Sequence, residues 1–259
     1  MTSRIRIPDA FPAVGDVDAR RVVITGAGRG LGELLAHAFS SSGAKVALVA
    51  RTARDLRDVA ASLPGTSRCF VGDLRDAEFN EQVAAGVVDA WGGLDVWIGN
   101  AGISPVVARP RAVDPSVFRD VLDVNLTAAF LGARAAAGAM ADGGRVIFTG
   151  SVLGERPARG LSAYSASKAG LVALAKSLAL DLARDRITVN VVQPGWFDSP
   201  LATDWTTDPE RSAGVLAHTA LDAWGSSEEL AGAYLYLASD AASFVTGSVI
   251  TVDGGYLLV

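Results

Sequence analysis

Short apolar runs alternate with longer amphipathic stretches along most of the chain. The short runs are rich in β-branched residues and are bounded by glycine, proline or charged residues, which is typical of buried strands. We therefore predict strands at 21–25, 45–50, 68–71, 94–98, 145–149, 187–192 and 248–252. The longer stretches repeat their apolar positions with a helical period. Helices are expected at 31–42, 53–63, 76–91, 115–140, 163–183 and 227–238.

A strand followed by a helix, repeated along the chain, indicates βαβ units and a parallel sheet covered on both faces. The sequence therefore predicts an α/β protein with a three-layer, doubly wound Rossmann fold and a parallel sheet of seven strands. Residues 1–18, with Pro8, Pro12 and Gly15, predict an irregular N-terminal arm, so that 19–259 would form a single Rossmann-type domain. The stretch 196–224 is long and lacks a clear period, and we interpret it as a lid.

Composition narrows the classes of protein to which the chain can belong. Half of its 259 residues are hydrophobic and a fifth are charged, so it can bury a large core. The net charge is −5 and the basic residues are scattered, which argues against a nucleic-acid partner. One cysteine, Cys69, and two histidines, His37 and His218, are too few for a typical structural zinc site, so no metal is expected.

Two sequence features bear on location. The first residues lack the apolar core of a signal peptide, and no apolar run approaches the ~18 residues of a membrane span. We therefore expect a cytoplasmic protein without a membrane partner.

A glycine-rich turn lies between the first predicted strand and the first predicted helix. It reads Thr25-Gly26-Ala27-Gly28-Arg29-Gly30-Leu31-Gly32. Glycines allow a tight turn and let the backbone approach a pyrophosphate, while the free N–H groups and the dipole at the helix start favour negative charge. This strand–turn–helix context predicts a dinucleotide site formed by Gly26, Gly28, Arg29, Gly30, Leu31 and Gly32.

This turn and several later motifs resemble one family of enzymes. TGAGRGLG is similar to the glycine motif of the short-chain dehydrogenase/reductase family. Further matches follow in the family's order: Asn100-Ala101-Gly102, Asn125, Ser151, Tyr164, Lys168, Pro194-Gly195 and Val252-Asp253-Gly254-Gly255. The resemblance covers about residues 20–256 and extends to members of the 3-oxoacyl-(acyl-carrier protein) reductase type. It implies an NAD(P)-dependent oxidoreductase that acts on CH–OH donors.

The end of the second predicted strand bears on the choice of nicotinamide cofactor. An acidic residue there would bind the ribose 2′-OH of NAD, but this chain has Ala50 followed by Arg51. Arg51 and Arg29 can together flank a 2′-phosphate, which favours NADP(H) over NAD(H). The alternative is that either guanidinium is simply solvated.

The resemblance adds further cofactor contacts. It implies that Asp73 meets the adenine amino group, that Leu74 lies beside the ring and that Asn100 lies beneath the ribose. A helix N-cap is nearly as good an interpretation of Asp73. The resemblance also assigns to the cofactor site Ala101, Gly102, Tyr164, Lys168, Pro194, Gly195 and Ser199, of which Ser199 would bond the carboxamide.

The candidate catalytic residues begin with Tyr164 and Lys168, which are four residues apart and so share one face of a predicted helix. A nearby ammonium stabilises a phenolate, so we expect the pKa of Tyr164 to fall from its usual ~10. Ser151 follows a strand, where its hydroxyl can steady a substrate oxygen. The resemblance implies that Asn125, inside 115–140, holds a relay water. The predicted reaction is reversible hydride transfer between nicotinamide C4 and a small-molecule ketone or secondary alcohol, with Tyr164 as acid/base.

Other activities remain open. A 3-oxoacyl-(acyl-carrier protein or CoA) reductase is the first alternative, although Asp142 and Asp185 stand where carrier-specific members tend to have Arg, with Arg184 and Arg186 beside the latter. An NAD-linked alcohol or sugar dehydrogenase is the second. A non-catalytic dinucleotide-binding regulator is remote because the catalytic matches are intact. A serine hydrolase with His218 as base is also remote because Ser151 lacks the G-x-S-x-G context.

The segment 196–224 is rich in aromatic and apolar residues. These residues can line a pocket for an apolar or cyclic substrate, or they can pack the lid onto the domain. They are Trp196, Phe197, Leu201, Trp205, Val215, Leu216, His218 and Leu221. The resemblance also implies a homotetramer, or a dimer, packed through the helices at 115–140 and 163–183.

Overall fold

The computed structural model describes residues 16–141, 143–197 and 206–259. Its centre is a sheet of seven strands in the order β3-β2-β1-β4-β5-β6-β7, and every neighbouring pair is parallel. The strands are β1 (Arg21–Thr25), β2 (Lys45–Ala50), β3 (Ser67–Val71), β4 (Val96–Gly99), β5 (Gly144–Thr149), β6 (Ile187–Pro194) and β7 (Val249–Val252). The predicted parallel α/β fold is confirmed.

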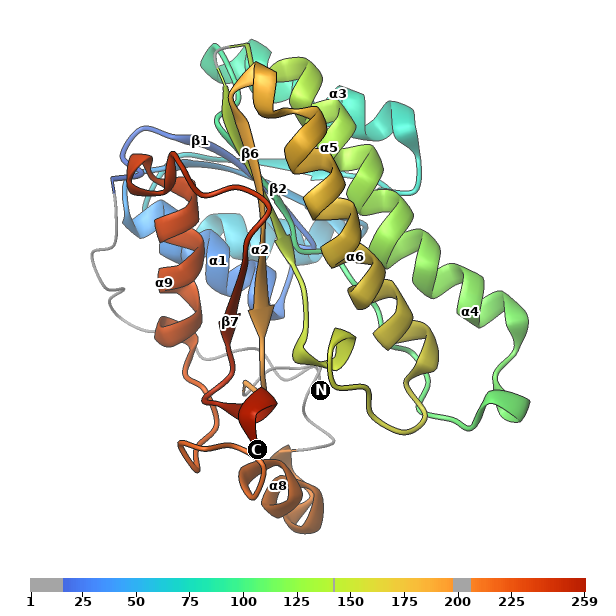
Figure 1. Cartoon of the computed structure of the whole chain (residues 1–259). Helices are drawn as coiled ribbons and strands as arrows, with labels where there is room; N and C mark the ends of the chain where they lie inside the picture. The colour runs from blue at the N-terminus through green and yellow to red at the C-terminus, as the bar shows by residue number, and fades with distance from the viewer. Residues whose placement is uncertain (1–15, 142, 198–205) are drawn as a thin grey trace.

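Helices cover both faces of the sheet (Figure 1). The α-helices of the described residues are α1 (Gly30–Ser41), α2 (Ala53–Ser62), α3 (Ala77–Trp91), α4 (Pro115–Leu122), α5 (Ala128–Ala139), α6 (Ser162–Asp181), α8 (Pro209–Leu216) and α9 (Ser227–Ala238). On one face, α1, α2 and α9 bury side chains such as Phe39 and Leu56. On the other, α3, α5 and α6 bury side chains such as Val83 and Leu171. The two cores and the sheet between them make the three layers.

The central strands are apolar throughout because their side chains alternate between these two cores. In β1, Val22 and Ile24 belong to the core under α1, whereas Val23 belongs to the core under α3. A strand that is buried on both faces reads as a continuous apolar run, and β-branched residues pack well on its pleated surface. This is why the apolar runs located the strands.

The predicted helix over 115–140 is helical from Pro115 to Ala139, but its middle turn is π-helical. α4 ends at Leu122, a π-helical turn runs over Asp123–Thr127, and α5 begins at Ala128. A π turn widens a helix locally and occurs frequently at functional sites. This one carries Asn125, whose amide pairs with the backbone of the segment that follows β4.

The segment 196–224, predicted to be irregular, contains the helix α8. Asp208 is its N-cap and accepts hydrogen bonds from the backbone N–H groups of Glu210 and Arg211. Residues 198–205, with Leu201 and Trp205, lie outside the described residues, as do residues 1–15 of the predicted arm.

The order of the strands reverses between β1 and β4. The chain moves outward from β1 to β2 and β3, then returns to place β4 on the other side of β1. In open parallel sheets, ligands bind at the carboxyl ends of the strands at such a reversal. The glycine-rich turn follows β1 and Asn100 follows β4, so the topology brings these two predicted parts of the site together.

Candidate active site

The glycine-rich turn packs tightly against the segment that follows β4. Gly26 has a φ of 68°, and a Cβ atom placed on it would lie 2.9 Å from the Ala101 Cα atom. A Cβ atom on Gly32 would lie 2.1 Å from the Gly26 carbonyl oxygen. Larger side chains therefore do not fit here. The first N–H groups of a helix lack partners within it, and a phosphate can approach those of α1 closely.

Thr25, the last residue of β1, holds the segment after β4 in place. Its Oγ1 atom accepts hydrogen bonds from the backbone N–H groups of Asn100 (2.9 Å) and Ala101 (3.1 Å) and donates one to the Ile98 carbonyl oxygen (3.1 Å). The Asn100 side chain donates from Nδ2 to the Thr25 carbonyl oxygen at 3.0 Å. Asn100 is thereby fixed beside the glycine-rich turn.

The two arginines predicted to bind a 2′-phosphate are both exposed. Arg29 is the N-cap residue of α1, and Arg51 directly follows β2. Within the described part of the chain, neither guanidinium has a hydrogen-bond or ion-pair partner. Both groups are therefore available to an anion at this edge of the sheet, although the Arg51 charge also acts on the Asp73 carboxylate and helps to lower its pKa.

Asp73 is engaged by Arg75 and does not cap a helix. The Arg75 guanidinium donates from Nε to Oδ1 of Asp73 (3.1 Å) and from Nη2 to Oδ2 (2.6 Å). These hydrogen bonds hold the pKa of Asp73 below its usual value. The N-cap of α3 is Asp76, which accepts from the backbone N–H of Glu78. The N-cap interpretation of Asp73 is wrong, while its adenine contact stays a prediction.

A small, mostly apolar cavity lies next to the glycine-rich turn. It is lined by Thr25, Leu74, Trp97, Gly99, Ala101, Val124, Ala128 and Ala129. The cavity is no larger than a water molecule, so it does not itself hold a ring. Leu74, which was expected beside the adenine, lies on its wall. The glycine-rich turn and the exposed arginines fit the phosphates of a dinucleotide.

Tyr164 and Lys168 lie one helical turn apart on α6. The Lys168 side chain is buried, and its Nζ atom donates a hydrogen bond to the Thr149 carbonyl oxygen at 2.7 Å. Burial lowers the pKa of Lys168 to about 8. The same Nζ atom lies 5.7 Å from the centre of the Tyr164 ring. The ammonium and the phenol therefore share one enclosed space at the end of β5.

Ser151 follows β5 and lies beside Tyr164. Its Oγ atom accepts a hydrogen bond from the backbone N–H of Leu153 at 3.2 Å and begins a short turn over Val152–Gly154. Burial raises the pKa of the Tyr164 phenol, and a hydrogen bond with Ser151 opposes this only in part. The expected fall in the Tyr164 pKa is therefore wrong for the chain alone, because desolvation of the phenolate dominates.

Asn125 is buried in the π turn and connects three segments of the chain. Its Oδ1 atom accepts from the backbone N–H of Ile103 at 2.8 Å. Its Nδ2 atom donates to the Ile103 carbonyl oxygen and to Ser167 Oγ, each at 3.0 Å. These bonds tie the segment after β4 to α6. The relay water expected at Asn125 stays a prediction.

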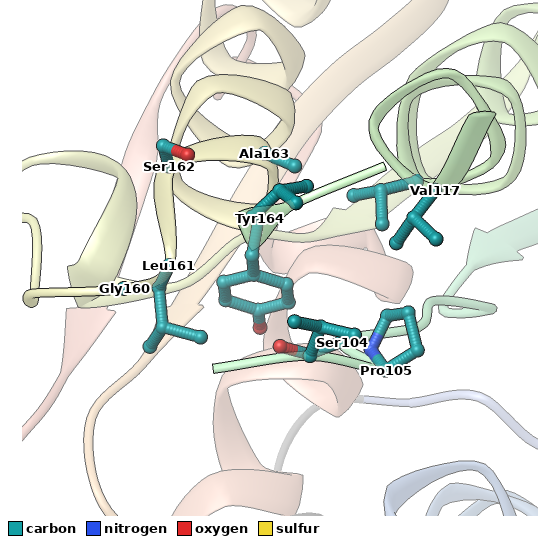
Figure 2. A pocket seen from close by; sticks show the side chains of 11 residues that line it. Ser104, Pro105, Val117, Gly160, Leu161, Ser162, Ala163 and Tyr164 are labelled. Carbon is teal, nitrogen blue, oxygen red and sulfur yellow. The ribbon is translucent and has the colours of Figure 1, made fainter. Parts of the chain in front are cut away.

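An apolar pocket lies beside the Tyr164 ring, between Leu161 on one side and Ser104 and Pro105 near its hydroxyl end (Figure 2). Charged side chains are absent from its described lining, which consists of Ser104, Pro105, Val106, Val113, Val117, Val121, Gly160, Leu161, Ser162, Ala163 and Tyr164. The segment after β4, α4 and the start of α6 supply these walls.

The two ends of the segment 196–224 meet at an aromatic cluster. The rings of Trp196 and Trp224 pack edge to face with centres 6.0 Å apart, and the Trp196 ring lies 6.1 Å from that of Tyr256. Phe197 and Val215 are buried. For these residues, packing onto the domain is the better interpretation. Of the others in this segment, Leu216 is half-buried, and His218 and Leu221 are exposed.

Pro194 and Gly195 lie at the end of β6 against the last strand. The Gly195 N–H donates to the Val252 carbonyl oxygen at 2.8 Å, and a Cβ atom on Gly195 would lie 2.6 Å from the Asp253 Cα atom. Ser199, predicted to bond the carboxamide, and Asp142 lie outside the described residues.

The described residues also bear on a hydrolase, on a metal site and on a membrane span. His218, the only histidine after Ser151 in the sequence, pairs through Nδ1 with the Gly214 carbonyl oxygen at 2.8 Å, which gives a hydrolase no support. In the described ranges, no group of three or more His, Cys, Asp or Glu side chains can hold a metal ion. Nor does any described helix have the length and apolar character to cross a membrane.

Sequence reasoning missed three residues that hold the site together: Thr149, Ser167 and Tyr234. The Thr149 carbonyl oxygen accepts a hydrogen bond from the Lys168 ammonium. The Tyr234 hydroxyl oxygen lies 2.8 Å from Thr149 Oγ1. Thr149 had a signal, because it is a polar residue at the end of an apolar strand. Tyr234 had none, because an aromatic residue on the buried face of a helix reads as ordinary core.

Comparisons with known proteins agree along nearly the whole chain. A family model described as enoyl-(acyl carrier protein) reductase matches residues 26–257. The 3-oxoacyl-(acyl-carrier-protein) reductase of Salmonella typhimurium is 33% identical over 244 residues, which cover 93% of this chain and 99% of that protein. The cis-4-hydroxycyclohexanecarboxylate dehydrogenase of Sinomonas cyclohexanicum is 35% identical over 252 residues, which cover 95% of this chain and 100% of that protein.

Solved structures agree as well. The crystal structure of a short-chain dehydrogenase from Burkholderia cenocepacia in complex with NADP has a TM-score of 0.86 and 29% sequence identity to this chain. The match covers 93% of this chain and 99% of that one. With its parallel seven-stranded sheet, its glycine-rich turn and these relatives, the chain belongs to the short-chain dehydrogenase/reductase family of NAD(P)-dependent oxidoreductases.

Proposed function

We propose that this enzyme transfers a hydride reversibly between nicotinamide C4 of NADP(H) and a small-molecule ketone or secondary alcohol, with Tyr164 as acid/base. The surroundings of Tyr164 carry the proposal. Its phenol adjoins Ser151 and Lys168, and its ring forms part of an apolar pocket. A ketone in that pocket would present its oxygen to the phenol.

The chain's own residues would move and hold the proton. When bound, the nicotinamide supplies the hydride for reduction and accepts it in oxidation. Tyr164 donates its proton to the substrate oxygen in reduction, and its raised pKa keeps it protonated at neutral pH, which suits this direction. Ser151 steadies the same oxygen with a hydrogen bond. The Lys168 ammonium stabilises the phenolate that remains, and Asn125 would hold the water that returns the proton.

The preference for NADP(H) over NAD(H) rests on the edge of the sheet at β2. Ala50 occupies the position where an acid would select NAD, and Arg29 and Arg51 offer two exposed guanidinium groups. The NADP complex of the Burkholderia relative supports this choice. By the family resemblance, Asp73 and Leu74 would hold the adenine, while Asn100 and Lys168 would lie at the ribose.

The pocket beside Tyr164 favours an apolar substrate. Within the described residues, its side chains are apolar apart from the hydroxyl groups of Ser104, Ser162 and Tyr164. A sugar would lose much of its hydration there and gain few hydrogen bonds in return. The relative that acts on a hydroxycyclohexane ring supports the same class. We therefore favour an aliphatic or alicyclic ketone that is free in solution.

A 3-oxoacyl-(acyl-carrier protein) reductase is the second candidate, because the Salmonella relative carries that name. Docking of an acidic carrier needs basic residues near the mouth of the site. Asp185 is exposed where carrier-specific members tend to have Arg, and this weighs against a reductase that docks a carrier protein.

We further propose that the enzyme assembles as a homotetramer.

The test is oxidation of NADPH with alicyclic and aliphatic ketones, with acetoacetyl-carrier protein beside them. Tyr164→Phe removes only the phenol hydroxyl and should lower kcat about a hundredfold or more. Tyr236→Phe, a half-buried tyrosine on α9, is the matched control and should leave kcat unchanged. Undiminished turnover by Tyr164→Phe would reject the acid/base assignment, and turnover of the carrier substrate alone would favour the second candidate.

A further inference from the structure

Two buried hydroxyl groups lie beneath the candidate site and have no part in the proposed proton transfer. Tyr234 on α9 is fully buried, and its hydroxyl oxygen lies 2.8 Å from Thr149 Oγ1 at the end of β5. Thr149 Oγ1 in turn lies 3.2 Å from Asn100 Oδ1, in the segment after β4. A hydrogen-bonded chain thus runs from one helix layer to the candidate cofactor site.

The donor at each step follows from the chemistry of the groups. Asn100 Nδ2 donates to the Thr25 carbonyl oxygen at 3.0 Å, which fixes the orientation of the amide. Asn100 Oδ1 can only accept, so the Thr149 hydroxyl donates to it. The single proton of Thr149 is then used, and the Tyr234 hydroxyl must donate to Thr149 Oγ1. Burial raises the pKa of Tyr234, which keeps this donor protonated.

Thr149 holds two residues of the candidate site at once. Its hydroxyl orients the Asn100 amide, and its carbonyl oxygen accepts from Lys168 Nζ at 2.7 Å. Both Thr149 and Lys168 are buried, so water does not readily replace a bond that is lost. A displacement of Thr149 would therefore move the Lys168 ammonium and the Asn100 amide together.

We propose that Tyr234 is a positioning residue, which acts through Thr149 to hold Lys168 and Asn100 in the geometry that hydride transfer needs. The inference rests on the function proposed for this site, but the hydrogen-bonded chain can be tested without cofactor. A tyrosine that only filled the core would be replaced by phenylalanine without effect on turnover, since the ring and its packing remain.

A double-mutant cycle in the full chain measures whether Tyr234 acts through Thr149. Tyr234→Phe should lower kcat and NADPH affinity by about three- to tenfold each, with little change in KM for the ketone. Thr149→Val should cost more, because it removes the bonds to both Tyr234 and Asn100. Adding Tyr234→Phe to Thr149→Val should then change kcat by less than about twofold. Tyr236→Phe serves as the control on the same helix.

A readout from the cofactor-free protein makes the outcome independent of the proposed reaction. The chain has three lysines, Lys45, Lys168 and Lys176, so ¹⁵N-lysine labelling gives few Nζ resonances, and Lys168→Met assigns the buried one. Tyr234→Phe and Thr149→Val should both shift the Lys168 resonance, and Tyr236→Phe should not.

An unmoved Lys168 resonance in Tyr234→Phe, or kinetic losses that simply add in the double variant, would overturn the positioning role. A shifted resonance in a protein that reduces no ketone would instead overturn the proposed function and support the hold of Tyr234 on Lys168.

Discussion

Arg51 stands at the end of β2, where its charge can distinguish the two nicotinamide cofactors. Arg51→Ala should weaken NADPH binding by about tenfold or more, because a charge-assisted bond to the 2′-phosphate is lost, and should change NADH binding by less than about twofold. Fluorescence titration measures both. Arg54→Ala is the control, because Arg54 is 85% exposed on the neighbouring helix and pairs only loosely with Asp58, at 3.9 Å. Equal losses for the two cofactors would contradict a phosphate contact.

Lys168 should make the unfolding free energy depend on pH. Its pKa is lowered to about 8 in the folded chain, against 10.5 for an ordinary lysine. Below pH ~8 the amine is charged in both states, and burying the charge costs stability in full. Above that pH the folded state loses its proton first, so the unfolded state binds more protons and stability rises with pH. From about pH 7 to about pH 9.5 this group should add about 2 kcal/mol.

Urea unfolding over that pH range measures the effect, and Lys168→Met should remove it. Lys176→Met is the matched control, because Lys176 is exposed on the same helix and should leave the pH dependence in place. Tyr164 and Tyr234, whose pKa values are raised by burial, begin to oppose the rise near the top of this range, but they do so equally in Lys168→Met, so the difference between the two curves isolates Lys168. Parallel pH curves for the wild type and Lys168→Met would contradict the burial of an amine that loses its proton easily.

Single residues were predictable where a local pattern places them. Tyr164 and Lys168 share a helix face because they are four residues apart, and Arg51 follows an apolar run directly. The partners of these residues were not predictable, because they come from distant parts of the chain. Lys168 meets the Thr149 carbonyl, and burial raises the pKa of Tyr164 more than its hydrogen bond with Ser151 lowers it. Neither contact leaves a trace in the spacing of residues.

At the scale of elements, the stability that the π turn contributes should depend on the hydrogen bonds of Asn125. Asn125→Ala would leave the backbone N–H and carbonyl groups of Ile103 without their partners and should lower the unfolding free energy by about 2–3 kcal/mol. Thr127→Ala, at an exposed position of the same turn, should change it by less than about 0.5 kcal/mol. Urea unfolding of the two variants compares them. Equal stabilities would mean that the turn holds its shape without the Asn125 bonds.

The same turn shows why some elements escaped prediction. Apolar runs located the central strands because these are buried on both faces, whereas the edge strands β3 and β7 are only partly buried. An α helix and a π turn carry almost the same apolar spacing, so the sequence pattern does not distinguish them. The π turn over Asp123–Thr127 instead goes with the bonds of Asn125 to Ile103 and Ser167, which lie far away in the sequence. The helix α8 had a local signal that was not used, an Asp208 cap followed by Pro209 at the first helical position.

At the scale of the whole molecule, the order of strands explains why a linear pattern predicted the location of the site. The reversal between β1 and β4 brings the turn after one strand beside the segment after the other, and Thr25 bonds Asn100 and Ala101 across that junction. The substrate pocket had no such linear signal, because the segment after β4, α4 and the start of α6 each supply only part of it. The class of cofactor could therefore be predicted from the sequence, whereas the substrate could not.

The largest apolar side chains left exposed on α4, α5 and α6 lead to the last prediction. Phe118, Phe130 and Leu180 are 37%, 42% and 80% exposed, on the helices that the family resemblance implies pack against partner subunits. Large exposed apolar groups gathered on one set of elements are typical of protein interfaces. Light scattering of the wild type should therefore give the mass of a tetramer.

Phe130→Glu would place a charge in that interface and should yield smaller species, because a buried carboxylate without a partner is costly. Ala61→Glu, at an exposed position on α2, is the control and should leave the mass unchanged. Thermal unfolding of both variants at one protein concentration distinguishes dissociation from misfolding, since a folded subunit still unfolds cooperatively. A wild type that is monomeric at micromolar concentration, or a Phe130→Glu variant that stays tetrameric, would show that these side chains do not join the subunits.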